Sequence, residues 1–329
     1  MPINITDIVT EYRNYYLKSG QNLSRVKAAL MQPDVTLQQF GTRMYIEDTV
    51  YQMANPIYES LVQPFRKNFE AKGEVEFVPN KIELNHLKVD LSLYPHDIEA
   101  SWFGFLAGDN SKKLEDWPIV RYMLEEYLAK QVLEDKELHA VYKGEYNAAG
   151  NTPVTSLDGL KKKLVEAANN TKYPLNVISG INPFSAVSIL DQIEKYDEKI
   201  NSLYTSAPLI HFLAPKWVRL MKKDKRAKGY YFIDSADKIN DTIDFTNHVV
   251  VALPSMSGTD DIFTTVKQNL FHLVKRPNNY NAMNVDVQKA DRQIKILVDW
   301  WEAVGFGCNK LIWTTAETIG SNQSSGSGS

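Results

Sequence analysis

The chain has 329 residues, of which 43% are hydrophobic and 23% charged, and its formal net charge at pH 7 is −3. These values are typical of a globular protein with a substantial core, and they exclude a disordered or membrane-spanning chain. The slight acidity argues against a dedicated nucleic-acid binder but not against a protein that encloses nucleic acid. The one cysteine, Cys308, excludes an intrachain disulfide framework and a cysteine-based zinc site. We expect no signal peptide, no contact with a membrane, and a reducing compartment.

The first 65 residues carry short helical patterns that are interrupted by breakers. One pattern ends at Gly20 and the next at Pro33. The apolar spacing between Met44 and Asn68 again suggests helix, interrupted at Pro56 and Pro64. These pieces have no core of their own, so residues 1–65 are predicted to form an N-terminal arm that lies along another surface.

Residues 66–100 are predicted to form an extended β-hairpin. The stretch "GEVEFVPN" is followed by "KIELNHLKVDLSLYP" at 81–95, in which apolar and polar residues alternate. The alternation slips at Asn85-His86, which suggests a bulge. A two-stranded ribbon is marginal alone in water and needs a partner surface. The apolar face that requires cover consists of Leu87, Val89, Leu91 and Leu93.

The best single element is a long helix at about 116–142. Asp116 is placed to cap it, Pro118 suits its first turn, and Gly144 can end it. About 25 residues at 1.5 Å each would span roughly 38 Å. An apolar stripe at helical spacing runs through Val120, Leu124, Tyr127 and Leu128.

The rest of the chain mixes helices and strands. Helical patterns cover 154–170, a segment that starts at Asn182 and Pro183, and a basic segment from Pro215 to Gly229. Strand patterns occupy 208–214, 246–255, 261–274 and 284–315, and Trp300 and Trp301 would point to opposite faces of a covered strand. The predicted class is therefore α+β with mainly antiparallel pairing, followed by a flexible tail at 320–329.

Motifs for chemistry are scarce. Nucleotide-binding, nucleophile-elbow and zinc-protease signatures are missing. Ser24 and Lys27 match the S-x-x-K motif of penicillin-recognising enzymes, but the triplet that resembles K-T-G precedes this motif, which is the reverse of the order in those enzymes. The six histidines are scattered, and His211, in an apolar strand, is expected to be a satisfied core group. The basic run at 216–228 could contact phosphates, but a solvated helix end that complements the helix dipole is the favoured interpretation. We predict no enzymatic activity, cofactor or metal, with an α+β small-molecule enzyme as an alternative.

The order of elements over residues 40–317 resembles the major capsid protein of tailed double-stranded DNA bacteriophages, which has the Hong Kong 97-like shell fold. The stretch "DWPIVRYMLEEYLAKQVLEDKELHAVYKG" looks like the spine helix of that family. The stretch "APKWVRLMKKDKRAKGYYF" is similar to its axial domain, and "NVDVQKADRQIKILVDWWEAVGFGCNKLIWTT" to its closing strands. The resemblance implies a peripheral domain at 101–178 and 271–319, with the spine helix at about 116–142, and an axial domain at 179–270.

The resemblance also implies a function and a place for the hairpin. In this family the extended loop lies over a neighbouring subunit, so Leu87, Val89, Leu91 and Leu93 are predicted to make inter-subunit contacts. The chain would assemble with itself into hexamers and pentamers of an icosahedral phage head that encloses double-stranded DNA. It would be part of the virion, assembled in the bacterial host cytoplasm. Its partners would be portal and other head proteins, separate scaffolding or decoration proteins, and packaged DNA held without sequence specificity.

Two further expectations follow from the same resemblance. An encapsulin-type nanocompartment shell is the alternative with the same fold. No lysine–asparagine pair with an adjacent catalytic glutamate stands out, so no autocatalytic crosslink is predicted; the residues considered are Lys72, Lys81, Lys88, Asn281 and Asn284.

Overall fold

The computed structural model describes Ile8, Thr10 and residues 35–58, 61–70, 72–73, 75–108, 119–181, 183–229, 241–276, 283–290 and 293–320. The strands in these ranges are β1 (Thr42–Ile46), β2 (Val50–Tyr58), β3 (Val75–Glu83), β4 (Asn85–Leu93), β5 (Asn176–Ile178), β6 (Leu209–Leu213), β7 (Val249–Ala252), β8 (Ile262–Val266), β9 (Leu270–Lys275), β10 (Met283–Ala290), β11 (Gln293–Phe306) and β12 (Ile312–Thr315). The α-helices are α3 (Pro95–Ala107), α4 (Ile119–Tyr122), α5 (Ala129–Asp135), α6 (Leu160–Ala168), α7 (Ile189–Glu198), α8 (Pro215–Ala227) and α9 (Ala316–Gly320). None of the helices in these ranges has both the length and the apolar character needed to cross a membrane.

The long strand β11 is the axis of the first sheet. Its first half lies between β10 and β4, both antiparallel to it, and its last residues pair with β9. Strand β1 joins the edge parallel to β9. Ile294, Ile296, Val298 and Trp300 alternate along one buried face, as expected of a strand that is covered on that side. Trp301 points the other way and is half-buried, where it stacks on the His86 ring at 4.4 Å, so both faces are covered as predicted.

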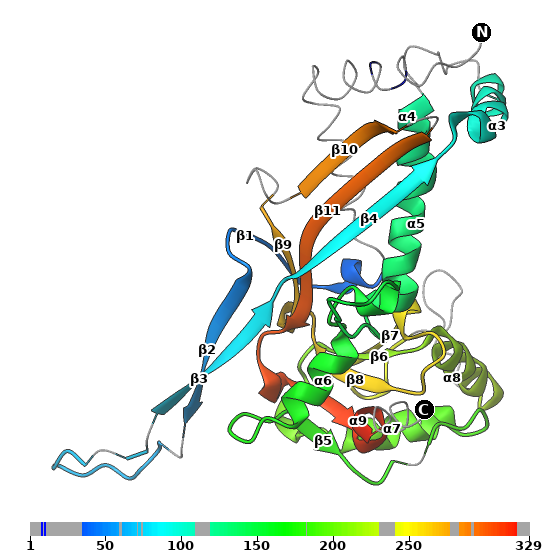
Figure 1. The fold of residues 1–329 in the computed structure, drawn as a ribbon. Helices are drawn as coiled ribbons and strands as arrows, with labels where there is room; N and C mark the ends of the chain where they lie inside the picture. Colours follow the sequence, from blue (N-terminus) through cyan, green and yellow to red (C-terminus); the bar gives the residue numbers. More distant parts are fainter. Residues whose placement is uncertain are drawn as a thin grey trace, which may run out of the picture.

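A continuous helix from residue 119 to residue 140 lies along this sheet (Figure 1). It consists of α4, a π-helical turn at Met123–Leu128, α5, and a second π-helical turn at Lys136–Ala140. At 1.5 Å per residue these segments span about 33 Å. The long helix is thus confirmed over the described residues, and its predicted start at Asp116 lies outside them.

Gly144 follows the end of this helix at a site with no room for a side chain. Its N–H donates to the carbonyl of Ala140 at 2.9 Å. A Cβ at this position would lie 2.4 Å from that same oxygen and 2.4 Å from the carbonyl oxygen of Leu157. The helix therefore ends just before Gly144, close to the predicted end, and the crowding explains why this position requires glycine.

The second sheet has the order β5-β12-β8-β6-β7. Strand β6 is antiparallel to β8 and parallel to β7, and β12 is antiparallel to β8 and parallel to β5. Helix α8 starts with Pro215 in its first turn and is followed by Gly229 at a positive φ of 76°. Both ends agree with the sequence prediction, because proline suits a helix start and glycine tolerates the left-handed conformation after a helix end.

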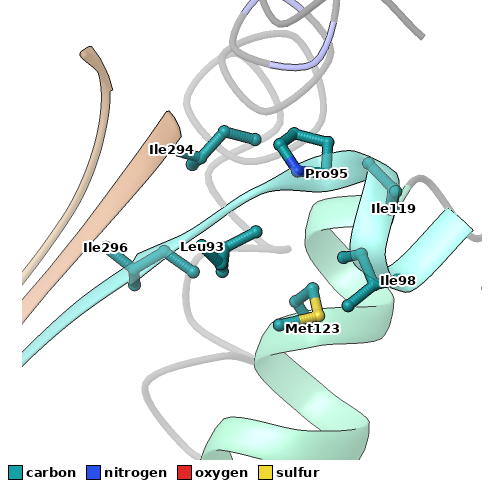
Figure 2. Close-up of a pocket in the computed structure, with 7 residues that line it drawn as sticks. All are labelled: Leu93, Pro95, Ile98, Ile119, Met123, Ile294 and Ile296. Atoms are coloured by element: carbon teal, nitrogen blue, oxygen red, sulfur yellow. The ribbon is translucent and has the colours of Figure 1, made fainter. Parts of the chain in front are cut away.

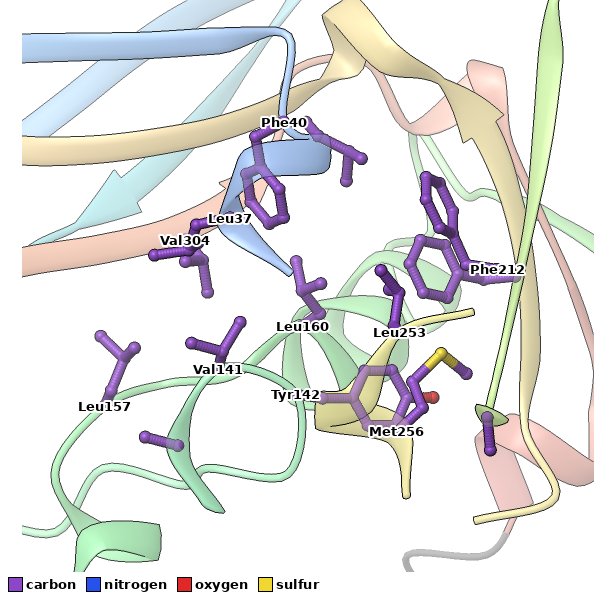
Figure 3. Close-up of a cluster of buried hydrophobic side chains, with 14 of the residues drawn as sticks. Leu37, Phe40, Val141, Tyr142, Leu157, Leu160, Phe212, Leu253, Met256 and Val304 are labelled. Carbon is purple, nitrogen blue, oxygen red and sulfur yellow. The ribbon is translucent and has the colours of Figure 1, made fainter. Parts of the chain in front are cut away.

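One hydrophobic core joins the two sheets where the long helix ends (Figure 3). Val304 of β11 enters it from the first sheet, and Phe212 of β6 from the second. Tyr142 lies between them, and its hydroxyl donates to the Asp261 carboxylate at 2.9 Å. The two sheets are therefore packed around shared side chains and do not form separate cores.

Two segments have a different secondary structure from the one predicted. The segment from Met44 to Ile57, predicted as interrupted helix, forms β1 and β2. Its burial alternates with a period of two, and each strand finds a pairing partner distant in sequence, which outweighs the weak helical spacing. Helix α3, which Pro95 begins, has no counterpart among the predicted elements.

Several predicted boundaries also change. Helix α7 begins at Ile189, so Pro183 lies before it in an irregular segment, while Asn182 lies outside the described residues. Strand β12 belongs to the second sheet, whereas the predicted peripheral domain at 271–319 groups it with β10 and β11. Of the first 34 residues of the predicted arm, the structure describes Ile8 and Thr10. Ile8 is buried in the main core. The rest of this stretch and the tail after Gly320 lie outside the described residues.

Candidate functional site

The hairpin formed by β2 and β3 extends away from both sheets (Figure 1). The two strands pair antiparallel along their whole length, from Val50 opposite Glu83 to Tyr58 opposite Val75. The described residues between them, 61–70 and 72–73, lie at the far end of the ribbon (Figure 1). A protrusion of this kind gains little stability from its own body and is suited to contact another surface.

The base of the hairpin is fixed to the first sheet. Ile82 and Leu84 are buried with Leu273 and Ala303 in a second, smaller hydrophobic cluster. A Cβ on Gly305 would lie 3.0 Å from the Ile82 side chain, so the ribbon approaches the β11 backbone closely.

Polar side chains also anchor the base. The Asn55 amide donates to the Gly307 carbonyl at 3.0 Å, and the Asn80 amide donates to the Phe306 carbonyl at 2.8 Å. Asn55 and Asn80 lie on opposite strands, so both strands are tied to the end of β11. The ribbon therefore leaves the body in a defined direction.

The far end of the hairpin exposes large apolar side chains. Phe65 is 92% exposed, Phe69 is 94% exposed and Val62 is 88% exposed. Contacts within the loop leave them exposed: the Arg66 guanidinium pairs with the Glu70 carboxylate at 3.0 Å. Exposed apolar side chains on a protrusion are typical of an interaction surface. We refer to Val62, Phe65 and Phe69 as the apolar tip.

The residues predicted to contact a neighbouring subunit lie elsewhere. Leu87, Val89, Leu91 and Leu93 belong to β4, which pairs with β11 of the same chain and not with β3. Leu87 is only 4% exposed, and the other three pack partly buried against the main core. The predicted hairpin at 66–100 is therefore wrong: β2 and β3 form the hairpin, and this apolar face packs against the main core of its own chain. Contact of the partly exposed members with another subunit stays a prediction.

The slip in alternation at Asn85-His86 has a different cause from the predicted bulge. Here the chain leaves the ribbon and enters the first sheet, since β3 ends at Glu83 and β4 begins at Asn85. Leu84 faces the small cluster at the hairpin base and Leu87 the main core. The signal that could have located the true ribbon is the period-two pattern of Tyr51 and Met53, which precedes the break at Pro56.

A small pocket lies where β4 meets α3 and the long helix (Figure 2). Every lining side chain is apolar, and the residues are Leu93, Pro95, Ile98, Ile119, Met123, Ile294 and Ile296. The lining contributes no ionisable or hydrogen-bonding side chain. Such a pocket can receive an apolar group, but it presents no side chain able to move a proton or hold an ion.

A buried charge cluster ties the long helix to the first sheet. The Glu302 carboxylate accepts from the Lys136 ammonium at 2.7 Å, from the His272 ring at 2.7 Å and from the Trp300 indole at 2.8 Å. Burial by itself raises the pKa of Glu302, but the adjacent Lys136 and His272 outweigh it and hold that pKa far below its usual range. All of these groups are enclosed, so the cluster stabilises the fold and offers no accessible reactive group.

Three of the seven basic residues in the run at 216–228 pair with acidic groups of their own chain. Lys222 pairs with Asp241 at 2.6 Å, and Lys228 pairs with Asp191 and Asp224. Lys225 is buried and donates to a backbone carbonyl at 2.5 Å. These contacts support the interpretation of a charged helix end over that of a phosphate-binding surface.

His211 does not behave as the fully satisfied core group that the sequence predicts. It is buried, and its Nδ1 lies 2.6 Å from the Thr264 hydroxyl, but its Nε2 makes no hydrogen bond. Asp197 and His248 lie beside it. Among the described residues, these three side chains bring potential metal-ligand atoms within 4.8 Å of one another.

No family model matches the sequence, and no curated protein matches it. Solved structures match the fold over most of the chain. A chain of the native GTA particle capsid has a TM-score of 0.55 and 14% identity, with 87% of this chain and 90% of that one covered. A chain of the satellite phage P4 procapsid, a particle that includes size determination (Sid) protein, has a TM-score of 0.53 and 9% identity, with 90% and 98% covered. A chain of the Myoviridae phage XM1 capsid has a TM-score of 0.51 and 11% identity, with 85% and 91% covered. The chain thus has the mixed α and β fold found in these phage and particle capsids.

Proposed function

We propose that this chain is a structural shell protein, the major capsid protein of a tailed double-stranded DNA phage with the Hong Kong 97-like fold. In this assignment the helix at 119–140 is the spine helix, the first sheet belongs to the peripheral domain, and the second sheet is the core of the axial domain. The β2–β3 ribbon, at Val50–Glu83, takes the place of the extended loop. The fold match over most of the chain supports this assignment.

The apolar tip is the single observation that carries the proposal. Side chains as exposed as Phe65 and Phe69 are unfavourable in water, and the base of the ribbon holds them away from their own body. A second copy of the chain is the partner that a shell provides at every position. A head-to-tail contact between identical subunits, repeated around an axis, generates a closed ring. Rings of six and five subunits can then close into an icosahedral shell.

The remaining partners follow from the same assignment. The inner wall of a phage head need only contain the DNA, which agrees with a net charge of −3 and with the acidic partners of Lys222 and Lys228. Portal, scaffolding and decoration proteins would act on the assembled shell. Assembly would take place in the bacterial host cytoplasm, and the mature location would be the virion.

The test is to express the full chain alone and examine it by size-exclusion chromatography and negative-stain electron microscopy. We expect rings of five or six subunits or closed shells. A monodisperse monomer at every concentration and ionic strength would overturn the proposal. Nuclease-protected DNA in particles from infected or induced cells supports a phage head, whereas a protein cargo without DNA identifies an encapsulin-type compartment.

A further inference from the structure

Three ionisable side chains meet inside the second sheet and its covering helix. Asp197 lies at the end of α7, His211 in β6, and His248 directly before β7. All three are buried, and the candidate ligand atoms lie within 4.8 Å of one another. Their sequence positions are far apart, so only the fold brings them together.

The two histidines approach the same carboxylate oxygen. His248 Nδ1 lies 2.5 Å from Asp197 Oδ1, and His211 Nε2 lies 3.0 Å from it. The His211 and His248 rings are nearly perpendicular, with centroids 5.6 Å apart. One nitrogen of each ring is therefore directed at a common point beside Asp197.

The outer nitrogens of both rings are occupied by acceptors. His248 Nε2 lies 3.0 Å from the carbonyl oxygen of Tyr204, which can only accept, so this nitrogen carries a proton. His211 Nδ1 lies 2.6 Å from the Thr264 hydroxyl, which itself donates to the Tyr196 hydroxyl at 3.0 Å. The Thr264 oxygen therefore accepts from His211 Nδ1–H. These partners set the tautomers, which leaves the lone pairs of the inner nitrogens facing Asp197.

Lone pairs that face a carboxylate in a buried site are unfavourable without a positive charge between them. His211 Nε2 shows the consequence directly, since it is buried and makes no hydrogen bond. A metal cation satisfies all three inner atoms at once.

We propose that Asp197, His211 and His248 form a structural site for a divalent transition-metal ion of the zinc class. Imidazole nitrogens and a carboxylate are ligands that zinc accepts, and histidine ligands commonly donate their other N–H to a carbonyl or another oxygen acceptor. The ion would lie between the Asp197 carboxylate and the inner nitrogens of the two rings, Nε2 of His211 and Nδ1 of His248. The second carboxylate oxygen or one water completes the four ligands.

The site would fasten α7 to the parallel pair β6 and β7. The two strands pair from Ile210 opposite Val249 to Leu213 opposite Ala252, so both histidines enter at the same end of that pair. The metal would act as a crosslink within one subunit. It is independent of the apolar tip, so this inference does not depend on the proposed shell function.

The test uses the full-length chain, stripped with EDTA and then titrated with zinc chloride or cobalt chloride alone. We expect about one zinc per chain by elemental analysis, a rise in Tm on adding zinc, and visible absorption bands for bound cobalt. His211→Gln and Asp197→Asn should weaken zinc binding by roughly 100-fold or more, because each removes one of three ligands. His272→Gln is the matched control, since His272 is equally buried but bonds Glu302 outside this site.

Each outcome decides the inference. Stoichiometric zinc that is retained by His272→Gln and lost by His211→Gln supports it. Zinc binding that persists in both His211→Gln and Asp197→Asn overturns it, because the ion then binds elsewhere. If these variants do not fold, the cobalt spectrum and the Tm of the wild-type chain remain: a wild-type chain that binds neither metal at micromolar concentration also overturns the site.

Discussion

Replacing Phe65 and Phe69 together with serine tests whether the apolar tip drives assembly. Both side chains are more than 90% exposed in the single chain, so the substitution removes no intramolecular packing. We therefore expect the Tm of the isolated subunit to change by little. The effect should be confined to contacts between subunits.

The size of that effect follows from the area that contact would bury. Burial of one phenylalanine side chain contributes about 2 kcal/mol, so two contribute about 4 kcal/mol for each ribbon that docks. In a closed shell each subunit donates one ribbon and receives one. A loss of about 4 kcal/mol per subunit raises the concentration needed for assembly roughly a thousandfold, since 1.4 kcal/mol is a factor of ten.

The assay measures the fraction of protein in particles by light scattering and electron microscopy over a dilution series. Val187→Ser with Leu203→Ser is the matched control, because these side chains are 86% and 83% exposed and belong to the segments on either side of α7, not to the ribbon. We expect the control to assemble as the wild-type chain does. Assembly of Phe65→Ser/Phe69→Ser at the wild-type concentration would refute the role of the tip.

Two further predictions concern the stability of the subunit. Glu302→Gln should destabilise the fold by roughly 3–5 kcal/mol at neutral pH, because Lys136 loses its buried partner. The folded-state pKa of Glu302 lies below its ordinary value of 4.5, so the stabilisation by Glu302 is present above pH 4.5 and is lost as the pH falls toward the folded-state pKa. The urea midpoint of the wild type should therefore fall more steeply with acid than that of Glu302→Gln. Parallel curves for the two proteins would contradict the argument. Gly144→Ala should cost roughly 2–4 kcal/mol through its clash with backbone oxygens. Gly104→Ala in α3, where a new Cβ meets nothing within 4 Å, should instead stabilise by about 1 kcal/mol; thermal unfolding of the pair checks both signs.

The sequence by itself determined the elements that depend on local signals. The long helix, the ends of α8 at Pro215 and Gly229, and the covered strand with Trp300 and Trp301 all follow from periodicity and from the backbone preferences of proline and glycine. The resemblance in the order of elements over residues 40–317 predicted the mixed α and β fold that the capsid structures share. These signals need no knowledge of which segments meet in space.

Only the tertiary structure decided which strands pair and which side chains meet. Alternation shows that β4 has one apolar face, but not that β4 pairs with β11 and packs Leu87 into the main core, while β2 and β3 form the projecting ribbon. His211 and His248 likewise give no local sign that they converge on Asp197. Strand pairing and the convergence of side chains depend on contacts between residues that are distant in the chain. The local sequence pattern of one segment does not reveal which other segment it contacts.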